Sequence, residues 1–138
     1  MKGSCLCGEV SFELSGEFPP IYQCHCSLCR KVSGSSSNSA LIVKASNFKW
    51  RTGEHQIRSF STSSGFKSEF CCQCGSPVPN ISSNDDSYWV PVGLLSEPVD
   101  TKVAAHVYVG SHANWDVGDG IPQFETMPSE KDWLELRR

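Results

Sequence analysis

The sequence predicts a mainly β domain with little helix. Apolar and polar residues alternate at a period of two; in residues 9–14, the apolar side chains Val10, Phe12 and Leu14 alternate with polar ones. This alternation is typical of a strand with one buried face. Short apolar segments bounded by turn residues recur along the chain, and helix signals are few. Many short strands with little helix favour an all-β architecture.

The other strands are expected at regular intervals. The candidates are 39–43, 48–50, 55–61, 65–70, 89–95 and 103–109. Segments 55–61 and 65–70 are expected to pair as a hairpin, because the Thr-Ser-Ser-Gly sequence between them favours a turn. Pro91 lacks a backbone N–H, so the strand that contains it is expected at a sheet edge or at a bulge.

Two short helices complete the predicted elements. Residues 26–31 fit a single helical turn. Ser129, with Asp132 three residues later, resembles a capping box, which would start a helix over 129–136. Residues 110–128 contain three glycines and two prolines, and they are expected to form an ordered surface loop that is long enough to suggest a function.

Length and composition narrow the class of protein. The 138 residues are enough for one domain, so we expect residues 1–138 to form a single unit. The net charge is −3, from 12 basic and 15 acidic side chains, which gives no electrostatic case for binding nucleic acid. No apolar run approaches the roughly 20 residues of a membrane helix, and the N-terminal residues do not resemble a secretory leader. We therefore expect a cytoplasmic protein, in which thiols stay reduced.

Four of the eight cysteines predict a closed metal site. Cys71 and Cys74 have the C-x-x-C spacing that wraps a turn around a metal ion. Cys5 and Cys7 are two residues apart, so their side chains lie on one side of a strand and can converge if the strand bends. A zinc ion held by these four thiolates would be structural, because no coordination position remains for a substrate. The alternative is a set of unpaired buried thiols.

A second group of cysteines predicts an open site. Cys24, Cys26 and Cys29 lie within six residues, and their thiolates are expected to face one centre. Three protein ligands leave one zinc position free, which is the pattern of catalytic zinc, and a substrate thiol is a natural fourth ligand. The alternative is a second structural zinc whose fourth ligand is Cys72 or a histidine such as His25. Cys72 is otherwise expected to be a small buried side chain.

The remaining candidates have ordinary structural interpretations. Because it lies between two predicted ligands, the His25 side chain is expected to point away from the metal. Histidines without ligand-like spacing are expected at the surface or in packing contacts: His55, His106 and His112. Aromatic residues expected in the core are Phe60, Phe66 and Phe70. Arg30 and Lys31 follow the second cysteine group, where they either meet a substrate carboxylate or face solvent.

The cysteine motifs together resemble a known family. The segments that carry the resemblance are Gly3–Gly8, Cys24–Arg30 and Phe70–Gly75, with the Gly/Pro-rich tail of residues 110–124. They resemble the family of glutathione-dependent formaldehyde-activating enzymes, which also includes centromere protein V. The resemblance covers nearly the whole chain, from about residue 2 to residue 128. Three ordered motifs are specific, whereas any one alone would be weak.

The resemblance implies a fold, two metals and a reaction. It implies a β-tent fold of packed antiparallel sheets. It implies one structural and one catalytic-type zinc ion per chain at the two cysteine groups described above. It also implies the condensation of formaldehyde with glutathione to S-(hydroxymethyl)glutathione, a carbon–sulfur lyase reaction whose partners are a small thiol and a small aldehyde. The alternative function is a non-catalytic binding module with two structural zinc sites.

Overall fold

The computed structural model describes residues 1–96, 98–116 and 118–137. Its backbone contacts gather in two compact units. Unit 1 comprises Met1–Phe18 and Ile42–Val99, and unit 2 comprises Pro19–Leu41 and Asp100–Arg138. The described residues form ten strands and two α-helices, which confirms the mainly β class. The expectation of a single domain over residues 1–138 stays a prediction.

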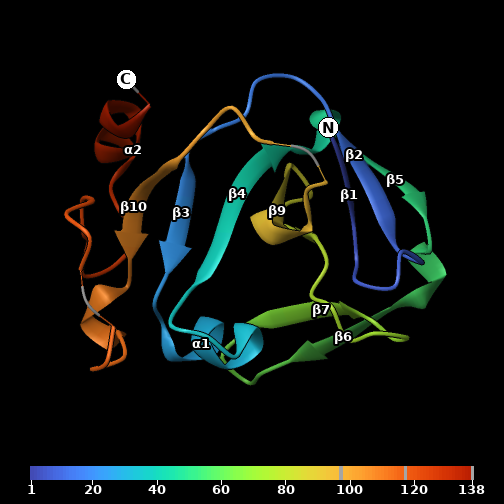
Figure 1. The fold of residues 1–138 in the computed structure, drawn as a ribbon, viewed down its shortest axis with the longest axis horizontal. Coiled ribbons are helices and arrows are strands. Elements are labelled where there is room, and N and C mark those ends of the chain that lie inside the picture. The colour runs from blue at the N-terminus through green and yellow to red at the C-terminus, as the bar shows by residue number, and fades with distance from the viewer. Residues whose placement is uncertain (97, 117, 138) are drawn as a thin grey trace. The chain divides into compact units, whose positions relative to one another are not determined.

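A three-stranded antiparallel sheet forms part of unit 1. Its strands are β1 (Lys2–Ser4), β2 (Ser11–Leu14) and β5 (Phe48–Thr52), in the order β1-β2-β5 (Figure 1). The period-two pattern predicted β2 correctly, since Phe12 and Leu14 are buried in this sheet. Strand β1 is only three residues long, too short to show a period, and was not predicted.

A hairpin of unit 1 leads into the cysteine motif of residues 71–74. Strands β6 (Ile57–Ser61) and β7 (Lys67–Cys71) pair antiparallel, as predicted. The turn closes through a hydrogen bond from the Thr62 backbone N–H to the Phe66 carbonyl. The prediction that Phe60 lies in the core is wrong, because its side chain is 64% exposed. In a two-stranded hairpin, one face can remain in solvent even where the residues alternate.

Another short hairpin of unit 1 pairs β8 (Asn80–Ile81) with β9 (Ser87–Pro91). The strand predicted over 89–95 therefore ends earlier than expected. Pro91 is its last residue, and Val92–Leu94 form a 3-10 turn. The missing N–H of proline explains this end, because proline cannot donate to a continuing ladder.

Unit 2 is organised by three strands, β3 (Ile21–Cys24), β10 (Val103–Val107) and the start of β4 (Asn38–Lys44). Strand β3 pairs antiparallel with β4 and parallel with β10 (Figure 1). The expectation of antiparallel sheets therefore holds for the pairs described above but not for β3 and β10. A parallel pair needs a long connection, and the chain supplies one, because about 80 residues separate the two strands.

Two seven-residue helices belong to unit 2. Helix α1 (Ser27–Ser33) begins at the Cys26 cap and ends at Gly34, whose φ is 62°. Helix α2 (Glu130–Leu136) begins with the predicted capping box of Ser129 and Asp132. Within the described part of the chain, neither helix is long and apolar enough to cross a membrane.

Candidate metal centres

The first cysteine group converges in unit 1. The sulfur atoms of Cys5, Cys7, Cys71 and Cys74 all lie within 4.8 Å of one another. Two of the separations are 3.5 Å, between Cys5 and Cys7, and 3.8 Å, between Cys7 and Cys71. Sulfurs on one tetrahedral zinc lie about 3.8 Å apart, given Zn–S bonds of about 2.3 Å. The spacing therefore suits a tetrahedral ion held by four thiolates.

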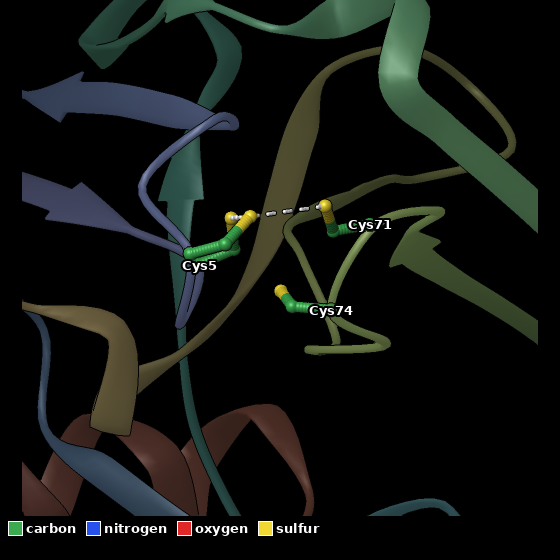
Figure 2. Close-up of side chains that lie close together, drawn as sticks. Cys5, Cys71 and Cys74 are labelled. Carbon is green, nitrogen blue, oxygen red and sulfur yellow. Dashed lines mark hydrogen bonds between the residues drawn. The ribbon is translucent and has the colours of Figure 1, made fainter.

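Two tight turns position these four sulfurs. The first follows β1, where the Gly8 backbone N–H bonds the Cys5 carbonyl and the Val10 N–H lies 3.3 Å from the Cys5 sulfur. The second follows β7, where the Gly75 N–H bonds the Cys71 carbonyl. Figure 2 shows Cys5 on one turn, with Cys71 and Cys74 on the other, their sulfurs facing a shared space. Gly75 has a φ of 74°, a conformation that favours glycine, so the C-x-x-C turn depends on it.

The core of unit 1 surrounds part of this group. Cys5 and Cys71 are buried together with Val10 and Val78, and Trp50 packs against the cluster.

The backbone N–H of Ser76 is the main cause that lowers the pKa of the Cys74 thiol to about 6. One thiolate is therefore favoured near neutral pH, which is the form that binds a metal.

The second cysteine group converges in unit 2. The sulfurs of Cys24, Cys26 and Cys29 lie within 4.8 Å of one another. Cys24 ends β3, while Cys26 caps α1 and Cys29 lies in its first turn. The Cys26 sulfur accepts a hydrogen bond of 3.3 Å from the Cys29 backbone N–H. The helix start therefore fixes the spacing of two of the three candidate ligands.

Hydrogen bonding within this group favours one thiolate. A hydrogen bond from the Cys29 thiol is the main cause that lowers the pKa of Cys24 to about 6. The same interaction, with burial, raises the pKa of Cys29. The group can thus hold a negative charge on sulfur before any ion binds, which suits a cation-binding site.

Among the described residues, the group contains these three candidate ligands. Neither of the two alternative fourth ligands considered above belongs to it. Cys72 is exposed, and its thiol donates to the side-chain oxygen of Gln56 at 2.9 Å. The expectation that Cys72 is buried is therefore wrong; its neighbour Cys71 occupies the inward position. The assignment of the seven cysteines as zinc ligands stays a prediction.

A buried histidine pair was missed in the sequence. His25 and His106 are 4% and 6% exposed, and Nε2 of His25 lies 2.7 Å from Nδ1 of His106. Burial is the main cause that lowers the pKa of His25, and the neighbouring His106 adds to it. As expected, the His25 side chain is not among the candidate ligands. His55 and His112 are exposed, in line with the surface role expected for them.

Two converging cysteine groups on a mainly β scaffold define a candidate metal-binding protein. Residues 1–111 match the sequence model of the family described as glutathione-dependent formaldehyde-activating enzyme. The chain belongs to this family.

One curated relative comes from Halomonas elongata and is described as a candidate glutathione-dependent formaldehyde-activating enzyme. It is 31% identical to this chain over 87 residues, which cover 56% of this chain and 54% of the relative. The chain thus spans about half the length of the curated relative it matches.

A solved structure shares the fold. The crystal structure of a Rhodobacter sphaeroides protein superposes with a TM-score of 0.60 at 23% sequence identity. The match covers 75% of this chain and 99% of that one. At this level of identity, the likeness shows the fold alone.

Proposed function

We propose that this chain is a zinc-dependent enzyme of the carbon–sulfur lyase type, which joins a thiol such as glutathione to formaldehyde. The observation that carries the proposal is the three-sulfur group of Cys24, Cys26 and Cys29 in a member of this family. The four-sulfur group serves as a structural site. A cytosolic location, where thiols stay reduced, suits a chain whose eight cysteines are all free.

The donor atoms support zinc at both groups. All candidate ligands are cysteine sulfurs, which select zinc and other soft ions over magnesium or calcium. Four sulfurs complete a tetrahedral zinc, whereas three leave a position for a substrate. A zinc ion bound by Cys24, Cys26 and Cys29 would stabilise the thiolate form of the substrate thiol near neutral pH. A donor set of three thiolates is rich in electrons and suits thiol chemistry better than the activation of water.

The reaction itself needs no redox partner. The substrate sulfur forms a bond to the carbonyl carbon of formaldehyde, the C=O π bond breaks, and the oxygen takes up the proton that the thiol lost. The product is a hydroxymethyl thioether. Cys26 and Cys29 at the start of α1, together with Cys24 at the end of β3, would hold the zinc ion that binds the substrate thiol.

Arg30 is the best candidate for holding the rest of the thiol substrate. Its Nε atom is buried and, among the described residues, has no hydrogen-bond partner. A guanidinium group suits a carboxylate, and glutathione carries two. Lys31 is exposed, as an ordinary surface charge is.

The test is an exchange measurement on the zinc-loaded chain. Exchange between formaldehyde hydrate and its glutathione adduct is followed by NMR while the protein concentration is raised, because the uncatalysed reaction contributes a constant background. We expect the exchange rate to rise linearly with protein and the slope to vanish in Cys26→Ser. Cys72→Ser is the matched control, since Cys72 is an exposed cysteine outside both groups, and it should keep the full slope.

Metal content separates the possible outcomes. We expect two zinc ions per wild-type chain and one in Cys26→Ser. A flat exchange rate with two bound zinc ions would overturn the catalytic proposal and favour the binding module. A slope that survives in Cys26→Ser would show that the three-sulfur group is not the reactive site.

A further inference from the structure

Strand β6 is the open edge of a small sheet in unit 1. The sheet consists of the two strands β6 and β7 (Figure 1). The other edge of β7 is covered by residues 76–80, whose groups bond to the Lys67 and Glu69 carbonyls. Among the described residues, β7 is the strand that pairs with β6. The outer edge of β6 is therefore the side at which this sheet can grow.

The register of the hairpin shows which backbone groups lie on this outer edge. The Thr62 N–H bonds to the Phe66 carbonyl, and bonded positions alternate along an antiparallel pair. The N–H and C=O groups of Phe60 therefore face β7, whereas those of Ser59 and Ser61 face outward. No hydrogen bond from another segment of the described chain reaches the outward groups of Ser59 and Ser61.

The side chains of β6 do not protect this edge in the usual ways. Proteins commonly block an open edge with lysine, proline or a bulge. Strand β6 contains neither residue type, and its pairing with β7 has no register shift. The Phe60 ring is 64% exposed. The guanidinium of Arg58 donates to the His55 and Ile57 carbonyls, which holds it close to the backbone of the same strand.

The backbone of β6 is complementary to a second copy of itself. In an antiparallel pair centred on Ser59, each Ser59 donates its N–H to the Ser59 carbonyl of the other copy. Ser61 faces Ile57 of the other copy and donates to its carbonyl, which has a second lone pair besides the one that the Arg58 side chain uses. The Ile57 N–H takes no part in this pairing, because it already bonds to the Glu54 carbonyl.

The same register places complementary side chains opposite each other. Phe60 faces Arg58 of the other copy at a position without backbone hydrogen bonds, where side chains across two strands lie closest. A guanidinium group stacks favourably on the face of an aromatic ring. Within its own hairpin, Arg58 has Phe70 as its cross-strand neighbour, so it would lie between two rings. The two arginines are not directly opposite, and like charges do not meet.

We propose that β6 pairs antiparallel with β6 of a second copy of this chain, so that the two hairpins form one continuous sheet. A two-stranded sheet is marginally stable on its own, and additional strands stabilise it. Because a single pair of short strands forms a small interface, we expect a reversible dimer with a Kd between roughly 1 µM and 1 mM. The proposal does not depend on the thiol chemistry proposed above.

The test uses the zinc-loaded full chain under reducing conditions, so that the exposed Cys72 cannot form a disulfide-linked dimer. Sedimentation equilibrium from about 1 µM to about 1 mM protein measures the mass. Amide hydrogen exchange, followed by NMR at the same concentrations, locates the contact. We expect the Ser59 and Ser61 amide protons to exchange more slowly as the dimer forms. The Phe60 amide proton already faces β7 and should change much less.

Two substitutions of one exposed residue test the register. Phe60→Lys places an ammonium group opposite Arg58 of the other copy, whereas Phe60→Glu places a carboxylate there. Both remove the ring, so a contact that is merely hydrophobic would weaken equally in the two variants. Opposite charges favour a cross-strand pair and like charges oppose it, so we expect Phe60→Glu to dimerise about tenfold more tightly than Phe60→Lys.

A matched control comes from another strand of unit 1. Ile42 lies in β4 and its side chain is 45% exposed, so Ile42→Lys also replaces an exposed apolar residue by lysine. This variant should dimerise as the wild type does. Because Phe60 is exposed, its variants should keep the hairpin, and unchanged protection of the amide at position 60 at low protein concentration verifies this.

Three results would overturn the proposal. A monomer mass at every concentration would show that β6 does not pair with itself. A dimer in which the Ser59 and Ser61 amides stay unprotected would assign the contact to another surface. Equal dimerisation by Phe60→Glu and Phe60→Lys would show that Arg58 does not face position 60, which contradicts the register centred on Ser59.

Discussion

The sulfur of Cys7 lies 3.8 Å from the sulfur of Cys71, although 64 residues separate them in the chain. The two turns that carry them are also joined by a hydrogen bond from the Leu6 backbone N–H to the Ser76 hydroxyl. An ion bound here would close a long loop of the chain, which begins and ends in unit 1 and includes residues 19–41 of unit 2. Such a cross-link lowers the conformational entropy of the unfolded chain, and its effect grows slowly with loop length.

Removing this cross-link should destabilise unit 1. We expect Cys71→Ser, or treatment with a strong zinc chelator, to lower the free energy of unfolding by about 2–5 kcal/mol, the range for loss of a native cross-link in a small domain. Thermal unfolding with and without chelator measures the effect. Cys72→Ser should unfold like the wild type, since the Cys72 thiol is exposed and a serine hydroxyl can also donate to the Gln56 side chain. A chelator-insensitive midpoint would show that the four-sulfur group holds no structural metal.

The variant Cys26→Ser should separate metal binding from folding. The Cys26 sulfur accepts the capping hydrogen bond of α1, and serine is a preferred residue at that position. The substitution therefore removes a candidate ligand while keeping the cap. We expect the stability of the metal-free protein to change by less than about 0.5 kcal/mol, whereas the zinc content falls by one ion. Denaturant unfolding in the presence of chelator, with metal analysis of the untreated protein, checks both parts; a large loss of metal-free stability would contradict this account.

The sequence was most informative where the relevant spacing is local. The spacing within residues 24–29 predicted the three-sulfur group, because the covalent chain itself holds Cys24, Cys26 and Cys29 close together. In the four-sulfur group the local spacings explain only the two pairs, and the meeting of the pairs is a contact across 64 positions of the chain. The alternation around Phe12 predicted β2 for the same reason. The capping box at Ser129 needs only residues three apart, and it is present in the structure.

The histidine pair could not be predicted in the same way. His25 and His106 meet because β3 and β10 pair in parallel, with His25 just beyond β3 and His106 within β10. No local pattern records a pairing across 81 residues. The alternation of side chains along an extended chain predicted only that His25 points away from the candidate ligands. For Phe60 the strand was predicted correctly but the burial was not. An alternating pattern does not show whether another element covers the apolar face of the strand.

The cap of α2 should depend on pH. The Ser129 hydroxyl is the main cause that lowers the pKa of the Asp132 carboxyl from its ordinary value of 3.8. A carboxyl whose pKa is lower in the folded state adds stability above its unfolded value, and this stability is lost as pH falls through the folded value. We therefore expect α2 to fray below about pH 4.

Substitution at the cap isolates this effect. Ser129→Ala should destabilise α2 by about 1 kcal/mol near neutral pH, and it should return the pKa of Asp132 toward its ordinary value. Amide hydrogen exchange of residues 130–136, measured from pH 3 to 7, follows the helix directly. Equal pH dependence in the wild type and in Ser129→Ala would show that the capping box does not control the acid response.

Gly3 should not tolerate a side chain. It lies opposite Phe12 in the β1–β2 pair, and a Cβ on Gly3 would overlap the Phe12 ring. Because Phe12 is 1% exposed, the ring has no free space into which it can move without disturbing the core. Gly3→Ala should therefore destabilise the protein by about 1–3 kcal/mol, the usual cost of overpacking. Gly93→Ala is the control, since a Cβ there meets open space. Denaturant unfolding should show little change for Gly93→Ala, and similar stability in the two variants would mean that the Phe12 ring adapts at no cost.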